Sequence, residues 1–205
     1  MPEDAYNIES GEDKAWRELA AAGPESVVKR SLAAYDAASG SYTLTVFGEE
    51  YLVSPATRTI SNLSNPSRAD EILLRLAVPV YLVNARAVEP SGVLVKEFTG
   101  GEIFLKGTHV LPTDEIAKKY GSDGDYFLRA GMAELGGAPV RLGDAAIGFR
   151  PFPRVSMTMI LWLMDEEFPA RASLLFDGNA DRHMPIDVVW AAALLACERM
   201  LKILN

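Results

Sequence analysis

The most apolar stretch of the chain restricts the fold more than any other feature. Residues 157–163 read Met-Thr-Met-Ile-Leu-Trp-Leu, and a short continuous apolar run of this kind is typical of a strand buried on both faces. The acidic residues that follow predict a turn over 164–167, and residues 168–176 predict a second strand. We therefore expect a buried antiparallel hairpin at the centre of the core.

A long apolar helix is predicted directly after this hairpin. It should begin after Met184-Pro185, because proline is favoured at the start of a helix. Its apolar positions recur at helical spacing, and we expect Trp190 and Leu194 to face the core. The stripe consists of Ile186, Val189, Trp190, Ala193, Leu194, Cys197, Leu201 and Leu204.

The first half of the chain predicts helices and a second hairpin. We expect residues 1–40 to form a helical arm and residues 41–83 to form the hairpin and a further helix. The arm should hold one helix from Ser10 to the stop at Gly23-Pro24 and another from Glu25 to about Ala34. The hairpin strands should begin at Tyr42 and Tyr51, and the helix after Pro66 should end or kink at Pro79.

The rest of the chain divides into an irregular middle, 84–150, and the C-terminal hairpin and core helix, 151–205. The middle is rich in glycine, and it predicts extended pieces and short helices closed by glycine. These are Gly92–Phe98, Ile103–Leu105, the helix Thr113–Tyr120 capped by Thr113, and a helix over about 125–135. The fold class expected is a single compact α+β domain, an antiparallel sheet packed with helices. The similar polar turns of the two hairpins suggest a degenerate ββα duplication.

Charge and cysteine content exclude several functional classes. The formal net charge of −8 opposes binding to nucleic acid or to an anionic membrane surface. The single cysteine excludes an internal disulfide and a site built from several thiolates. With no secretory signal and no apolar run long enough to span a bilayer, a cytoplasmic protein is expected. Standard nucleophile and nucleotide motifs are also missing.

Oxygen-bearing side chains near the C-terminus partly match a calcium loop. Asp177, Asn179 and Asp181 have the spacing of its first ligands, but Arg182 stands where the loop needs glycine and Val188 where it needs glutamate. No specific metal site is therefore expected, and these three residues are only weak candidates. An Asx-rich turn leading into the last helix is the favoured interpretation.

The same region supplies the candidate ligand-binding residues: Trp162, Asp165, Glu167, Asp177 and His183. A pocket is expected near the C-terminal hairpin, and the aromatics that could form its wall are Trp162, Phe168, Phe176 and Trp190. A histidine beside a helix start could bind a metal or act as a base. Each also has a plain structural interpretation, as a core aromatic, a turn residue or a loop histidine. His109, the other histidine, has no neighbour at metal-binding spacing.

The segment Trp162-x-x-Asp165-x-Glu167-Phe168-Pro169, with Leu175-Phe176-Asp177 and Met184-Pro185-x-Asp187, resembles domain-of-unknown-function family 3786. Tyr35-Asp36 before Ser41-Tyr42-Thr43-Leu44 resembles it too. The resemblance implies a prokaryotic protein of anaerobic metabolism. Some members of the family carry a cysteine-rich iron–sulfur segment of the kind found near corrinoid proteins, and this chain lacks one.

Three functions remain open at this point. We favour a non-catalytic accessory module that binds a ligand or cofactor of unknown identity, of tetrapyrrole or corrinoid type, with an iron–sulfur or corrinoid protein as partner. The second is a metal-assisted hydrolase or lyase that uses Asp165, Glu167, Asp177 and His183. The third is a protein-interaction scaffold.

Overall fold

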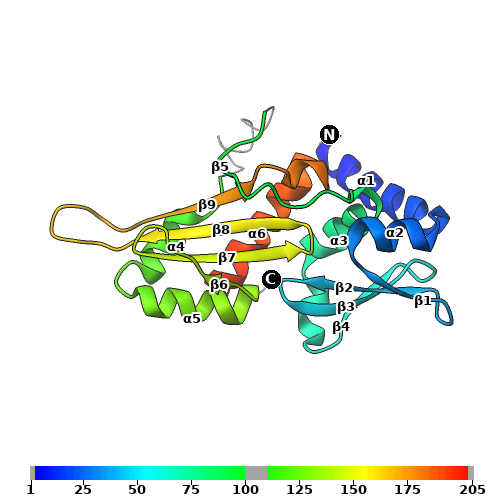
Figure 1. The fold of residues 1–205 in the computed structure, drawn as a ribbon, viewed down its shortest axis with the longest axis horizontal. Helices are drawn as coiled ribbons and strands as arrows, with labels where there is room; N and C mark the ends of the chain where they lie inside the picture. Colours follow the sequence, from blue (N-terminus) through cyan, green and yellow to red (C-terminus); the bar gives the residue numbers. More distant parts are fainter. Residues whose placement is uncertain (1–2, 100–109, 203–205) are drawn as a thin grey trace.

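A computed structural model describes residues 3–99 and 110–202, and within these residues the chain forms two antiparallel sheets with helices (Figure 1). The N-terminal sheet has the order β1-β2-β3-β4. The larger sheet has the order β5-β9-β8-β7-β6. The strands are β1 (Ala34–Asp36), β2 (Ser41–Val46), β3 (Glu49–Ser54), β4 (Thr59–Asn62), β5 (Leu94–Val95), β6 (Ala138–Pro139), β7 (Ala145–Phe152), β8 (Val155–Trp162) and β9 (Arg171–Asp177).

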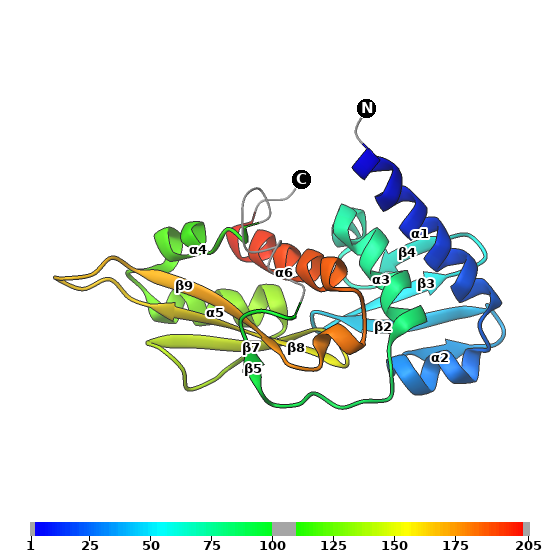
Figure 2. The same cartoon turned by 90° about the horizontal axis from the view of Figure 1, so that it is seen from above.

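Helices cover one face of the larger sheet and join it to the N-terminal half. Helices α4 and α5 contact β9 and β7, and α6 contacts α3, α4 and α5 (Figure 2). The helices are α1 (Glu3–Ala21), α2 (Pro24–Ser31), α3 (Ile72–Asn84), α4 (Thr113–Tyr120), α5 (Gly124–Leu135) and α6 (Ile186–Leu201), with 3-10 turns η1 (Pro66–Asp70) and η4 (Ala180–Arg182). None of the described helices is long and apolar enough to cross a membrane.

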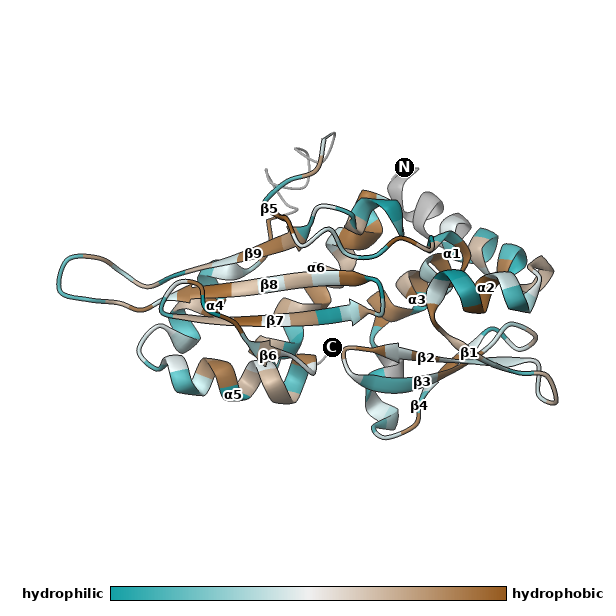
Figure 3. Cartoon of the chain, in the orientation of Figure 1, coloured by the Kyte–Doolittle hydropathy of each residue, from teal (hydrophilic) through white to brown (hydrophobic). Residues whose placement is uncertain are grey.

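Strand β8 lies at the centre of the larger sheet, as its apolar sequence predicts. Residues Met157–Leu161 are all buried, and Figure 3 shows β8 as one of the most hydrophobic strands. Its partners are β9, paired from Met157↔Phe176 to Trp162↔Arg171, and β7. One contiguous core of buried residues continues from this sheet into the N-terminal sheet and α3.

The turn between β2 and β3 of the N-terminal sheet packs against the larger sheet. Phe47 and Gly48 have φ values of 49° and 78°, the positive pair that a two-residue type I′ hairpin turn requires. The Phe47 ring is buried and stacks on Phe149 of β7 with centroids 6.0 Å apart. Its backbone N–H donates to the Pro151 carbonyl at 3.2 Å. The tip of the N-terminal hairpin is therefore inserted against the edge of the larger sheet.

A buried arginine ties the last helix to the same hairpin. Arg199 of α6 is 3% exposed, and its Nη2 donates to Glu71 Oε2 at 2.6 Å and to the Tyr51 hydroxyl at 3.0 Å. Its guanidinium lies 4.5 Å from the centre of the Phe47 ring. Nη1 has no hydrogen-bond partner among the described residues and lies 3.8 Å from Glu49. The shared core thus contains an ion pair that is almost entirely removed from water.

Several predicted boundaries differ from the structure. The first helix begins at Glu3, before the expected start at Ser10. Helix α3 passes through Pro79 and continues to Asn84, because its buried apolar flanks outweigh the cost of about 3 kcal/mol of a helical proline. Thr113 is the first residue of α4 and not its cap, since Pro112 holds the cap position.

The middle of the chain is more regular than expected. Residues 145–152 form the long strand β7, and β6 pairs with it. Of the two predicted extended pieces, Gly92–Phe98 contains β5, while Ile103–Leu105 lies outside the described residues. In α6, Trp190 and Leu194 are only half-buried. Val189, Ala193 and Cys197 of the predicted stripe are fully buried, and Ala192 and Ala196 are buried beside them.

Candidate binding pocket between β9 and α6

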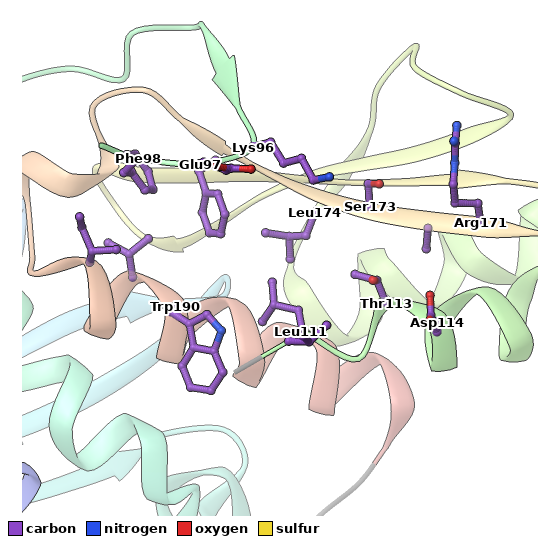
Figure 4. Close-up of a pocket in the computed structure, with 15 residues that line it drawn as sticks. Lys96, Glu97, Phe98, Leu111, Thr113, Asp114, Arg171, Ser173, Leu174 and Trp190 are labelled. Atoms are coloured by element: carbon purple, nitrogen blue, oxygen red, sulfur yellow. The ribbon is translucent and has the colours of Figure 1, made fainter. Parts of the chain in front are cut away.

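A cavity of about 510 Å³ lies between strand β9 and helix α6, open on one side (Figure 4). Its floor and walls are mainly apolar. Aromatic groups come from Phe98, Phe176 and Trp190, and the Phe98 and Phe176 rings lie 5.4 Å apart. Aliphatic groups come from Leu111, Leu174, Ile186, Val110 and Val189.

Charged and hydroxyl groups lie at the rim of this pocket. Lys96 and Arg171 carry positive charge, Glu97 and Asp114 carry negative charge, and Ser173 and Thr113 add hydroxyls. Figure 4 shows Lys96 and Arg171 above the cavity and Trp190 below it. The Arg171 guanidinium lies 4.4 Å from the centre of the Trp162 ring, which is within the range of a cation–π contact.

The segment that carries Lys96 to Phe98 is held in place by Asp177 at the end of β9. Asp177 is 2% exposed, and its carboxylate accepts hydrogen bonds from the backbone N–H groups of Ser91 (2.8 Å), Gly92 (2.7 Å) and Asn179 (2.9 Å). Ser91 adds its hydroxyl at 3.1 Å. Burial alone would raise the pKa of Asp177, but these hydrogen bonds outweigh it and hold the pKa below its usual value.

Asn179 and His183 hold the beginning of the same segment, at Arg86 and Glu89. The Asn179 amide donates to the Glu89 carbonyl at 2.9 Å. His183 is fully buried, and its Nδ1 accepts the Arg86 N–H at 3.3 Å, so the ring is the neutral tautomer with its proton on Nε2. Nε2 has no partner among the described residues. Burial, with the nearby charge of Arg154, lowers the pKa of His183.

Acidification is therefore expected to weaken the fold through His183. Its pKa is below 6.5 in the folded protein and near 6.5 when unfolded, so the unfolded chain binds more protons between these two values. Its stabilising effect is complete above about pH 6.5 and is lost as the pH falls toward the folded pKa. Urea unfolding between about pH 7.5 and pH 5 should show a shallower pH slope for His183→Asn, whose amide oxygen can replace Nδ1. Equal pH slopes of the unfolding free energy for the two proteins would show that protonation of His183 does not weaken the fold.

The predicted ligand-binding residues do not gather in one place. Asp165 and Glu167 lie in the exposed turn after β8, where Asp165 Oδ1 accepts the N–H groups of Glu167 and Phe168 at 2.8 and 2.7 Å. These backbone hydrogen bonds lower the pKa of Asp165. The turn and α4 enclose a separate, shallow concavity of about 580 Å³. Trp162, stacked on Arg171, is the predicted residue that adjoins the rim of the main pocket.

Asp177 and His183 lie at the other end of β9 from Asp165 and Glu167. The seven residues of β9 separate the two pairs by roughly 20 Å at about 3.3 Å per residue. Among the described residues, no group of three or more His, Cys, Asp and Glu side chains is placed to hold a metal ion. Asp181 lies exposed in η4. His109 lies outside the part of the chain that the structure describes.

The residues that form the pocket include only two, Phe176 and Trp190, that sequence reasoning named as candidates for its wall. The lining residues come from four separate stretches, 96–98, 110–114, 171–176 and 186–190, and no single stretch carries a motif. One signal was present. Trp190 lies in a helix whose other residues are mainly small or aliphatic, and a large aromatic on the less buried face of such a helix indicates a binding surface.

The sequence model of one family, described as Domain of unknown function (DUF3786), matches residues 23–199. No curated protein and no solved structure matches the chain.

Proposed function

We propose that this chain, which belongs to the DUF3786 family, is a ligand-binding module whose ligand occupies the pocket between β9 and α6. One observation carries the proposal: the cavity of about 510 Å³ has apolar walls and a few polar groups at its rim. Small molecules and cofactors bind in cavities of about 300–1,000 Å³ with this composition. The module's role is to bind and present its ligand rather than to transform it.

The lining indicates the general chemistry of the ligand. Trp190, Phe98 and Phe176 offer aromatic surfaces for an apolar body. Lys96 and Arg171 can pair with acidic groups at the edge of that body, and the hydroxyl of Ser173 can accept or donate a hydrogen bond. The ligand proposed is a mainly apolar molecule with polar groups on one side.

The biological setting is proposed from the family resemblance. An accessory role in anaerobic metabolism places a tetrapyrrole or a corrinoid first among the small molecules to test, with an iron–sulfur or corrinoid protein as partner. Tetrapyrroles and corrinoids both combine a large apolar ring system with acidic or amide side groups, which agrees with the composition of the pocket.

Native mass spectrometry of the protein, purified without oxygen from the organism that makes it, tests this function. The expected spectrum contains a bound small molecule in addition to the chain. Haem and cobalamin, titrated separately against tryptophan fluorescence, test the two named classes.

A pair of matched variants locates the site. Ser173→Trp places a large side chain at the rim of the pocket and should weaken binding of the retained molecule at least tenfold. Ser156→Trp changes the same residue type, half-buried on the neighbouring strand β8, at a different concavity, and should leave binding unchanged. If both variants bind like the original protein, the pocket between β9 and α6 is not the site.

A further inference from the structure

One wall of the pocket is the edge of a strand. Arg171, Ala172, Ser173 and Leu174 are consecutive residues of β9, and all four line the cavity. Successive side chains of a strand point to opposite faces of its sheet. A cavity lined by all four residues therefore reaches the backbone of the strand as well as the side chains of one sheet face.

The hydrogen bonds of β5 show which backbone groups face this side. Gly178 donates its N–H to the Val93 carbonyl at 2.9 Å, and Phe176 is paired with Val95. In an antiparallel strand, alternate residues direct both backbone groups to the same neighbour. Leu174 and Ala172 therefore direct theirs to the side of β5 and into the pocket, while Ser173 and Leu175 direct theirs to β8.

Strand β5 covers only the far end of this edge. It consists of Leu94 and Val95, opposite Asp177 and Phe176. Among the residues that the structure describes, no strand pairs with Arg171–Leu175 on the β5 side. Buried backbone groups are nearly always hydrogen-bonded, and the residues Leu174 and Ala172 are only 5% and 7% exposed. This part of the edge offers two donors and two acceptors in line with an existing strand.

We propose that the ligand of the pocket is an extended peptide segment of a protein partner, which pairs antiparallel with β9 and continues the line of β5. This inference rests on the proposed function, that the pocket binds a ligand, and names a peptide in place of a tetrapyrrole or corrinoid as the class of that ligand. Edge pairing gives affinity through backbone hydrogen bonds, and pockets for alternate side chains give specificity. Another peptide backbone matches both the donors and the acceptors of Leu174 and Ala172, which the periphery of a planar ring system does not.

The side chains of the bound segment follow from the same alternation. Every second one points toward α6, into the cavity walled by Leu111, Leu174 and Val189, and should be apolar. The others lie on the face that carries Ser173 and Arg171, so polar or acidic residues suit those positions. The recognised motif is an alternating apolar and polar segment with no proline at its hydrogen-bonding positions.

A phage-displayed library of random linear peptides, selected on the full chain, tests this inference. Enriched sequences should alternate apolar and polar residues. The best of them, synthesised and bound, should slow hydrogen exchange at the amides of Ala172 and Leu174, while Ser173 and Leu175 are protected with or without peptide because they pair with β8. N-methylation of every second peptide amide should weaken binding at least tenfold in one register and leave it unchanged in the other.

The outcomes separate the two proposals. A retained small molecule that is lost in Ser173→Trp, with no peptide enriched, would support the ligand-binding function and overturn the peptide inference. An enriched peptide that leaves exchange at Ala172 and Leu174 unchanged would also overturn it. If neither a small molecule nor a peptide binds at the pocket, both proposals fail. Ala172→Pro, which removes one edge-facing donor at a position where proline is tolerated, should weaken the peptide without lowering the melting temperature by more than a few degrees.

Discussion

Replacing Arg199 with methionine is expected to lower the free energy of unfolding by about 3–5 kcal/mol, the usual cost of breaking a buried ion pair from one side. The Arg199 side chain is 2% exposed and that of Glu71 is 11% exposed. Without the guanidinium, the Glu71 carboxylate and the Tyr51 hydroxyl lose their partner in the shared core. Urea unfolding followed by circular dichroism measures the loss directly.

An exposed ion pair of the same chemistry is the control. Arg58 and Asp13 are joined at 2.8 Å, but their side chains are 49% and 50% exposed, so Arg58→Met should cost no more than about 1 kcal/mol. In the double variant Arg199→Met, Glu71→Leu, which leaves no buried charge unpaired, much of the stability should return. Equal losses for Arg58→Met and Arg199→Met would show that burial of the pair does not determine its contribution.

Replacing Asp177 with alanine should have the second largest effect, a loss on the order of 2–4 kcal/mol. Hydrogen bonds to a charged acceptor each contribute about 1.5–3 kcal/mol, and water restores part of that to the freed donors. Because three backbone N–H groups and one hydroxyl depend on this carboxylate, the segment 86–98 should detach from β9. Hydrogen exchange at Ser91 and Gly92 should accelerate in the variant.

Asp36 provides a matched comparison for Asp177. Its carboxylate accepts the N–H groups of Ala38 and Ser39 and the Ser39 hydroxyl, but its turn is exposed, and Asp36→Ala should have a clearly smaller effect. Because the pKa of Asp177 is lowered in the folded protein, its contribution is complete above the ordinary carboxyl pKa and is lost as the pH falls through the folded value. A variant that keeps its stability and its exchange pattern would show that Asp177 does not hold the segment.

Strong local patterns in the sequence predicted the regular elements well. The alternation around Tyr42 and the apolar run at Met157 located the two hairpins, because side-chain period and burial are local properties of a strand. The second strand of the C-terminal hairpin, β9, begins at Arg171 and not at residue 168 as predicted. Helices α4 and α5 ended where glycine follows, and Gly136 indeed adopts a positive φ of 58°. The α+β class and the family resemblance were confirmed.

The missed elements depend on partners distant in the chain. Strands β1 and β4 are short and mostly exposed, so they carry little alternation of their own. Strand β7 contains Gly148 and Pro151, residues that weaken any local prediction of a strand. Arg199 falls within an apolar helical pattern, and only the position of Glu71 explains its burial.

The pocket was not predictable for a related reason. The sequence predicted ligand binding at Asp165, Glu167, Asp177 and His183, because polar residues cluster in sequence at turns. Two of them, Asp177 and His183, position the segment that carries Lys96, and they lie at the far end of β9 from the turn. A binding surface formed by a strand edge has no sequence motif, since its functional groups belong to the backbone.

The link between Arg199 and the first hairpin also determines when the shared core can form during synthesis. Arg199 follows Glu71 by 128 positions, which at about 5–20 residues per second corresponds to a delay of about 6–26 s on the ribosome. During that interval the helix that completes the core of the N-terminal strands has not been made. The N-terminal half therefore cannot complete its core until α6 has been made, and until then Glu71 lacks its partner Arg199.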